Sequence, residues 1–279
     1  MAAITAVILI AAGAVALAAM AVPVASGQPA QRAQPDDNPC ISPQAARLRC
    51  PDLVMKRPFG LYAQRLGRRT LLRGGNSIDS WGRGPAELHG QRTSARFMRA
   101  RQRIYKVGGG RIGVATGARL EFKRAHLNKR YWKFHDAARF ELWRLDKSGR
   151  RSRRARVGPK VSYCLRDLMH TRPRLGRSPR RPVYPACNTS PLKRRVTIGT
   201  SVGWSDIYPP AYPEQWIDVS GLQGCFAYVH IADPENGIYE SNEDNNESQV
   251  IVRLPWKGAG NRGCPGRSRG PSSRGEPGY

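Results

Sequence analysis

The residues of this sequence best suited to chemistry are one lysine, one tyrosine and a small set of histidines. Lys160 lies four residues before Cys164 in a β-branched segment, and Tyr208 lies seven residues before a Gln-Trp-Ile-Asp run that begins at Gln215. The chain has five histidines, which restricts general-base and metal-binding chemistry because imidazole is the usual group for both. The His-Glu-x-x-His pattern of metalloproteases and the P-loop of nucleotide-binding proteins are absent.

Several short runs, in one order along the chain, carry a resemblance to a known family. They are Leu71–Arg73, Asn76–Ile78, Gly82–Pro85, Gly158–Asp167, Tyr208, Gln215–Asp218 and Glu240–Asn246. Together they resemble the lysyl oxidase family over about residues 70–254. The alternative is a generic secreted β-sandwich whose last hairpin carries a similar Asn-rich sequence.

The resemblance implies a β-sandwich of the lysyl oxidase catalytic-domain type and a specific reaction. This family oxidises primary amines, such as peptidyl lysine, to aldehydes and releases ammonia and hydrogen peroxide. Its cofactors are copper and lysine tyrosylquinone, which forms from a lysine and a tyrosine of the protein itself. By motif match, Lys160 and Tyr208 are the expected quinone precursors. An oxidised tyrosine ring is an electrophile that a nearby unprotonated amine attacks, so these residue types suit that role.

The sequence departs from the family at the copper site. The family binds copper through a His-x-His-x-His run, and its ligand positions fall on Lys129, Tyr131 and Lys133. A lysine ammonium has no free lone pair and repels Cu(II). Nearby, His126 and His135 remain. We therefore expect copper and the quinone to be absent and the family activity to be lost or altered. The alternative is an active copper-dependent amine oxidase with a rearranged metal site that uses His126 and His135.

The charge of the chain predicts an anionic partner. The sequence has 47 Lys+Arg and 20 Asp+Glu, a net charge of +27, and residues 123–195 alone carry 23 basic and 4 acidic residues. Aromatic residues such as Tyr131, Trp132 and Phe140 alternate with these basic residues. For an exported protein this pattern favours an anionic cell-envelope polymer. No specific nucleic-acid site is evident, although extracellular DNA stays an alternative, and so does a merely solvated basic surface.

Composition divides the chain into four segments. Residues 1–27 have the apolar core and small-residue junction of a signal peptide, with an uncleaved membrane anchor as the alternative, so the protein is expected to be secreted or anchored outside the cell. A Pro-rich arm follows at 28–51, and the lysyl oxidase-like domain occupies 52–256. Residues 257–279 are rich in Gly, Arg, Ser and Pro and are expected to form a basic, disordered tail.

Short β-branched segments separated by turn residues predict an all-β, disulfide-stapled sandwich. Six cysteines without a Cys-x-x-Cys pair indicate disulfides in an oxidising compartment. Pairing of sequence neighbours gives Cys40–Cys50, Cys164–Cys187 and Cys225–Cys264 as the expected bonds, although six cysteines allow 15 connectivities.

The acidic insert at residues 233–247 is interpreted as a polar turn loop, with a Ca²⁺ site as the alternative.

Overall fold

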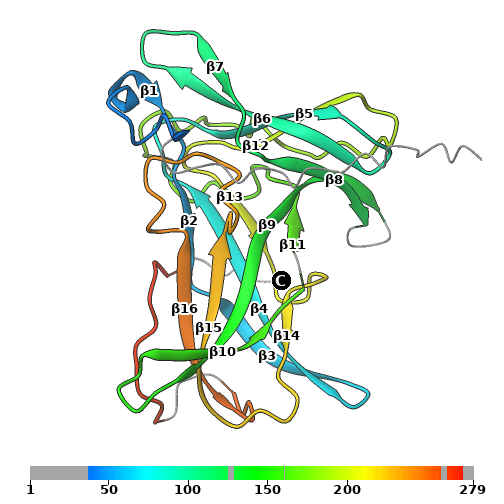
Figure 1. The fold of residues 1–279 in the computed structure, drawn as a ribbon, viewed down its shortest axis with the longest axis vertical. Helices are drawn as coiled ribbons and strands as arrows, with labels where there is room; N and C mark the ends of the chain where they lie inside the picture. The colour runs from blue at the N-terminus through cyan, green and yellow to red at the C-terminus, as the bar shows by residue number, and fades with distance from the viewer. Residues whose placement is uncertain (1–36, 125–128, 160, 259–262, 273–279) are drawn as a thin grey trace, which may run out of the picture. The chain divides into compact units, whose positions relative to one another are not determined.

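The computed structural model of the protein describes residues 37–124, 129–159, 161–258 and 263–272 (Figure 1). Apart from short turns such as η2 (Ala45–Arg47), its regular elements are β-strands. The strands are β1 (Leu48–Arg49), β2 (Leu53–Met55), β3 (Phe59–Leu66), β4 (Arg69–Ser80), β5 (Ala86–Arg92), β6 (Phe97–Lys106), β7 (Arg111–Val114), β8 (Arg119–Arg124), β9 (Arg130–Leu145), β10 (Arg151–Val157), β11 (Val161–Tyr163), β12 (Arg195–Thr200), β13 (Ser205–Tyr208), β14 (Trp216–Asp218), β15 (Gly224–Ala232) and β16 (Glu247–Leu254).

These strands form two antiparallel sheets. The larger sheet has the order β12-β5-β6-β8-β9-β15-β16, with β1 and β7 on β6 and with β10 and β11 on β9. The smaller sheet has the order β13-β4-β14, and β2 and β3 also pair with β4. Figure 1 shows the long strand β9 running from β8 at one end to β10 at the other. The all-β sandwich expected from the sequence is confirmed.

The two sheets share one hydrophobic core because each presents an apolar face to the other. Trp132 and Phe140 of β9, Phe226 and Tyr228 of β15 and Leu72 of β4 are all buried in it. These residues follow the two-residue period of a strand, which places alternate side chains on one face. Burial of a large apolar side chain contributes about 1.5–3 kcal/mol relative to exposure, so this core holds β4 and β9 in fixed positions.

Three disulfides join Cys40 to Cys50, Cys164 to Cys187, and Cys225 to Cys264, the pairs expected from the sequence. Their Cα–Cα distances of 5.7, 5.9 and 5.5 Å lie in the range that a disulfide can span. Three such bonds are typical of a protein exported to an oxidising compartment.

The segment 263–272 differs from the expected disordered tail. Arg269 exchanges two backbone hydrogen bonds with Gln249 of β16, at 2.9 and 3.0 Å, and Pro271 O accepts one from Arg57 N. The reason is that both faces of the β15–β16 pair are apolar. Ala227, Val229 and Ile251 form a second cluster with Cys264, so this segment covers a face that the core leaves exposed.

The Pro-rich arm also packs against the domain in its described part. Cys40, Leu48 and Cys50 form a small cluster with Ile104 of β6 and with Tyr239. The predicted signal peptide or anchor at residues 1–27 lies outside the described residues. Within the described part of the chain, no helix has the length and hydropathy needed to cross a membrane.

Candidate functional site

Tyr208, the predicted quinone precursor, lies in a cluster of aromatic rings at the end of β13. The strand is held by pairing with β4, where Tyr208 faces Asn76. The ring stacks on Tyr163, with centroids 3.9 Å apart, and meets Tyr212 at 4.8 Å. Its hydroxyl donates to Asp206 Oδ2 at 3.1 Å. We call Tyr163, Tyr208 and Tyr212 the tyrosine cluster.

Polar side chains buried in the core surround this cluster. Asn76 Nδ2 donates to the Tyr163 hydroxyl at 2.9 Å, and Gln215 Nε2 donates to the same oxygen. Asn76 comes from β4 and Gln215 from the turn before β14, and neither side chain has exposed surface. Because a buried polar group without a partner costs about 1–3 kcal/mol, this network fixes the position of the Tyr163 ring under Tyr208.

Burial sets the protonation of the two acidic groups at the centre of the site. It raises the pKa of the Tyr208 hydroxyl well above its usual value, and the neighbouring Asp206 raises it further. Burial likewise raises the pKa of Asp206 well above its usual value, although Arg166 opposes the effect. Tyr208 is therefore a neutral phenol at neutral pH.

Two of the three positions expected to hold copper, Tyr131 and Lys133, lie on β9, and Lys129 precedes this strand by one residue. Tyr131 pairs with Lys123 and Lys133 with Glu121 of β8. Burial increases along the three positions, because Lys129 is exposed, Tyr131 is half-buried and Lys133 is 2% exposed. Of the three, Lys133 is therefore the residue inside the protein.

Lys133 is connected to the tyrosine cluster through Tyr212. Its ammonium nitrogen lies 5.9 Å from the centre of the Tyr212 ring and donates to the backbone oxygen of Arg124 at 3.2 Å. Burial lowers its pKa to about 8, and the nearby carboxylates of Glu214, Glu121 and Asp206 limit the decrease. Lys133 is thus mainly a cation at neutral pH, close to the predicted copper position.

His135 is the histidine of the described chain nearest to that position. Its Nδ1 lies 3.1 Å from Glu121 Oε2, and its Nε2 lies 3.5 Å from Asp136 Oδ2. The Arg96 guanidinium also donates to Glu121, at 2.8 Å from Nε. Burial raises the pKa of Glu121, but the hydrogen bonds from Arg96 and His135 outweigh it and the pKa is lowered. The Glu121 carboxylate therefore already has two hydrogen-bond partners within the protein.

These residues do not fit Cu(II). Copper in proteins is held by several imidazole or thiolate ligands, whereas the matching strand offers two lysines and a tyrosine. Lys123 forms an ion pair with Glu214 at 2.9 Å, so further cations surround the position. In the described part of the chain, no group of three or more His, Cys, Asp or Glu side chains has a metal-binding arrangement. Two of the predicted residues, Lys160 and His126, lie outside the described residues.

Sequence reasoning missed most partners in this site. Tyr163, Glu121, Asp206, Tyr212 and Gln215 were not singled out as candidates. The available signal was polar residues inside apolar strands, as in Ser205–Tyr208 and Val161–Tyr163. That signal shows burial of polar groups, but a contact such as that of Gln215 with Tyr163, 52 residues apart along the chain, depends on the sheet topology.

A Gly-x-Ser-x-Gly run at Gly199–Gly203, a pattern also found in hydrolases, begins at the end of β12 and continues into the following turn. Its Ser201 is buried, and the hydroxyl donates to Asp167 Oδ2 at 2.7 Å while the backbone N–H donates to Oδ1 of the same carboxylate. Its hydrogen-bond partners among the described residues include no histidine. Ser201 therefore anchors a loop and lacks the base that a serine nucleophile needs.

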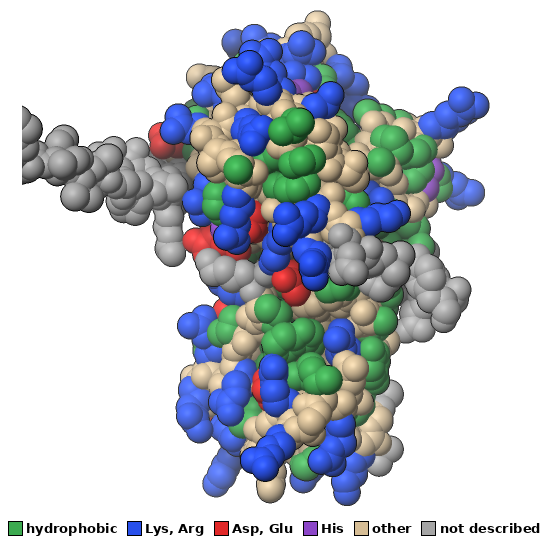
Figure 2. All heavy atoms as spheres, turned by 90° about the vertical axis from the view of Figure 1, so that its right-hand side faces the viewer, with side chains coloured by type: hydrophobic (Ala, Val, Ile, Leu, Met, Phe, Trp, Pro, Cys, Tyr) green, Lys and Arg blue, Asp and Glu red, His purple; other side chains and the backbone are tan. Residues whose placement is uncertain are grey.

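The mixed basic and aromatic face expected from residues 123–195 is reduced in extent, because Tyr131 and Trp143 are half-buried, with Arg154 over the Trp143 ring, while other aromatic residues of the region are fully buried. Trp132, Phe134, Phe140 and Tyr163 are buried in the core. The reason is strand alternation, which sends the aromatic residues inward and most of the basic residues outward. Figure 2 shows Lys and Arg spread over one face of the molecule, with Asp and Glu in only a few places.

The acidic insert forms polar turns. Asp233 accepts hydrogen bonds from the backbone N–H groups of Gly237 and Ile238, and Asn246 Nδ2 donates to Glu240 and Glu243. These contacts agree with the interpretation as a turn loop. Burial raises the pKa of Asp233 to about 7.

Comparison with known proteins gives one finding. The family model described as lysyl oxidase matches residues 65–260, which include strands β4 to β16 and the tyrosine cluster. No curated protein matches the sequence.

Proposed function

Because the chain belongs to the lysyl oxidase family, we propose that it is an exported member that has lost copper- and quinone-dependent amine oxidation and binds an anionic polymer of the cell envelope. The activity of the family is oxidation of primary amines. The observation that carries the proposal is the buried ammonium of Lys133 at a family ligand position.

A metal ion at this position would be repelled by fixed charges of the protein. Lys133 is buried beside Tyr212. Lys123 forms a salt bridge with Glu214, and Arg96 forms one with Glu121. Electrostatic repulsion between cations is strong in a partly buried site because the effective dielectric constant is low. The protein has thus replaced the charge of a metal with the charge of its own side chains, and the acids that remain are already paired.

The tyrosine cluster is retained as part of the core. Tyr208 is 4% exposed, stacks on Tyr163 and keeps a protonated hydroxyl. Each of these properties stabilises the fold, and none of them requires the quinone. We infer that Tyr208 now has a packing role.

The basic surface of the protein is then the part proposed to bind the anionic polymer. A net charge of +27 is far from the balance of ordinary domains and favours an anionic polymer by long-range attraction. The three disulfides and the family suggest an extracellular protein, where such a polymer belongs to the cell envelope.

The first experiment measures copper and quinone in the mature protein expressed with copper present. We expect copper far below one equivalent after dialysis against a weak chelator, and no redox-cycling quinone stain. The variant Lys129→His/Tyr131→His/Lys133→His is the matched control, because restored imidazoles should bind copper in the same assay. Stoichiometric copper in the unmodified protein, with a stain abolished by Lys160→Ala or Tyr208→Phe, would establish an active amine oxidase with a rearranged site. His126 and His135 would then be the first ligands to test.

The second experiment measures binding of polyanions as a function of salt. If phosphate or carboxylate charges are bound, the affinity should fall by on the order of tenfold or more between 50 and 200 mM salt. No binding at low salt, or binding that does not depend on salt, would contradict the proposed role.

A further inference from the structure

A groove lined by four arginines crosses the outer face of the β12-β5-β6 edge of the larger sheet. Its volume is about 430 Å³. We call it the arginine groove, defined by Arg92, Arg99, Arg101 and Arg195. The remaining lining residues are His89, Gly90, Gln91, Thr93, Val196 and Thr197. This lining contains no acidic residue and no Tyr, Trp or Phe.

Strand register brings the arginines together from separate parts of the chain. Arg195 of β12 faces Gln91 of β5, and Gln91 faces Arg99 of β6. In the next row of the same face, His89 faces Arg101. Neighbouring strands are about 4.8 Å apart, and alternate residues of one strand are about 7 Å apart. The Cα atoms of Arg99, Arg101 and Arg195 therefore form a triangle with sides of roughly 7–12 Å.

These arginines are not neutralised by the protein. Among the described residues, Arg92, Arg99, Arg101 and Arg195 form no ion pair with a carboxylate. One row further along β6, Arg103 shows the contrast, because its guanidinium lies 3.0 Å from Glu87.

Two backbone contacts hold part of the groove in place. Arg92 Nε donates to the backbone oxygen of Ser94 at 3.0 Å, and Arg101 Nη2 donates to that of Gly113 at 2.6 Å. Each contact uses one of the five N–H groups of a guanidinium. Both side chains are thus oriented and keep further donors for a ligand.

We propose that the arginine groove binds successive phosphate diesters of a linear polymer that has no stacked bases, an inference that rests on the proposed function and locates its site. A guanidinium pairs with two phosphate oxygens through its planar fork. A phosphate diester carries its two charged oxygens on a tetrahedral centre, so arginines from different strands can donate to it from different sides. A carboxylate holds both of its oxygens in one plane, so its strongest donors must approach within that plane.

The lining also argues against single-stranded nucleic acid. Proteins that bind single strands stack the bases on aromatic side chains, each worth about 1–3 kcal/mol. The arginine groove has no such platform. The hydroxyl of Thr93 donates to Phe97 O, and that of Thr197 lies 3.1 Å from His89 Nδ1, so the arginines are the main donors that the groove offers to a ligand. The expected ligand is therefore a polyol phosphate polymer.

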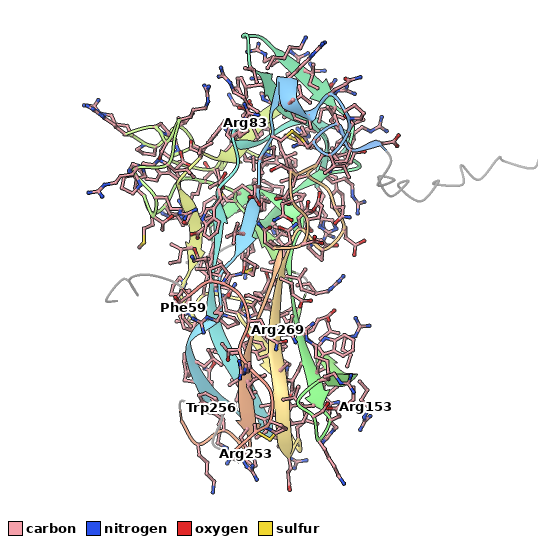
Figure 3. The ribbon with its side chains drawn as sticks, turned by 90° about the vertical axis from the view of Figure 1, so that its left-hand side faces the viewer. Phe59, Arg83, Arg153, Arg253, Trp256 and Arg269 are labelled. Atoms are coloured by element: carbon pink, nitrogen blue, oxygen red, sulfur yellow. A yellow bond between two sulfur atoms is a disulfide. The ribbon has the colours of Figure 1, made fainter. Side chains whose placement is uncertain are left out.

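The test compares two variants of the full mature chain that lose the same charge. One is Arg99→Ala/Arg101→Ala/Arg195→Ala in the groove. The control is Arg65→Ala/Arg153→Ala/Arg253→Ala, which removes three exposed arginines of β3, β10 and β16. Figure 3 labels Arg153 and Arg253 at the end of the sheets away from Arg83, and Figure 1 shows β5 and β6 far from β10.

Binding is measured by fluorescence anisotropy at 50 mM salt with poly(glycerol phosphate). We expect the groove variant to bind at least about 30-fold more weakly and the control variant less than about threefold more weakly. A third variant, Arg99→Lys/Arg101→Lys/Arg195→Lys, keeps the positive charge but lacks the planar guanidinium that pairs with two phosphate oxygens. Its affinity for poly(glycerol phosphate) should fall by about 5- to 10-fold. Unchanged circular dichroism spectra and melting temperatures show that each variant is folded.

Other outcomes separate this inference from the proposed function. Equal weakening by the groove and control variants overturns the groove as the site, while the proposed function stands. Tighter binding of a polyuronate of equal length overturns the choice of phosphate. Tighter binding of single-stranded DNA than of poly(glycerol phosphate) overturns the inference that the ligand has no stacked bases. Absence of binding to any polyanion contradicts the proposed function itself.

Discussion

The tyrosine cluster and the arginine groove use charge in opposite ways. Around Tyr208, each charged group lies beside a partner or has a pKa shifted by burial, as at Lys133, Glu121 and Asp206. In the arginine groove, the guanidinium groups of Arg99 and Arg195 project from a sheet face with no carboxylate partner among the described residues. The first region satisfies its own charges and the second leaves them available. On the proposal above, the predicted copper position has a structural role, whereas the outer face of the β12-β5-β6 edge is the surface proposed for binding.

The largest expected effect tests whether Lys133 is a structural cation. Lys133→Glu would place a carboxylate beside Glu121 and Glu214 in a buried position and should reduce the free energy of unfolding by about 4 kcal/mol or more. Lys129→Glu makes the same charge change four residues earlier, just before β9, but the side chain is exposed and the effect should stay within about 0.5 kcal/mol. Urea denaturation monitored by tryptophan fluorescence measures both. Equal effects of the two substitutions would show that Lys133 is not part of a charge balance.

The pH dependence of stability is the second expected effect. Asp233 has a folded pKa of about 7, above its unfolded value of 3.8, so the folded state holds an extra proton between these values. The contribution of Asp233 to the free energy of unfolding is present below pH 4 and is lost as pH rises to 7, by at most about 4 kcal/mol.

Lys133 has a folded pKa of about 8, below its unfolded value of 10.5. The unfolded state then holds the extra proton, and stability increases from pH 8 to 10.5.

Urea midpoints between pH 4 and pH 10 measure this dependence. The decrease from pH 4 to 7 should be smaller in Asp233→Asn, where Asp206 and Glu240 still contribute, and unchanged in Asp244→Asn, an exposed position in the same insert. The increase above pH 8 should be absent in Lys133→Met. If Asp233→Asn retains the full decrease, then another buried carboxyl group, with Glu240 the first candidate, is responsible.

A smaller effect tests the network below Tyr208. Tyr163→Phe removes the hydroxyl that accepts hydrogen bonds from Asn76 and Gln215 and leaves two buried donors without a partner. The expected loss is about 2–3 kcal/mol in the free energy of unfolding. Tyr62→Phe removes a hydroxyl at an exposed position and should cost less than about 0.5 kcal/mol. Thermal unfolding of both variants distinguishes a constrained core network from simple ring packing, in which both substitutions would be nearly neutral.

The sequence predicts the region around the tyrosine cluster better than the arginine groove. Strands, disulfides and the position of Lys129–Lys133 follow from local patterns, because alternation and motif order are encoded over a few residues. The arginine groove depends on which strands become neighbours, since Arg99 and Arg195 are 96 residues apart and meet only through β5. Composition indicated residues 123–195 as the basic region, but the groove takes three of its four arginines from β5 and β6. The covering of β15–β16 by residues 263–272 was also missed, because a Gly- and Arg-rich sequence shows no apolar pattern.

The smallest expected effect compares two arginines of the same strand. Arg101 has no carboxylate partner among the described residues, whereas Arg103 is paired with Glu87. Burial raises the pKa of Glu87, but hydrogen bonds from His89, Tyr184 and Tyr105 lower it to about 2. The Glu87 carboxylate therefore stays charged, and its negative charge offsets the positive charge of Arg103. Arg101→Ala should therefore weaken poly(glycerol phosphate) binding by about 5- to 10-fold, and Arg103→Ala by less than about twofold. The slope of log affinity against log salt should shrink by about 0.7 for Arg101→Ala and stay unchanged for Arg103→Ala. Equal losses in the two variants would mean that the polymer senses the total charge of the face, and that pairing with Glu87 does not remove Arg103 from the binding surface.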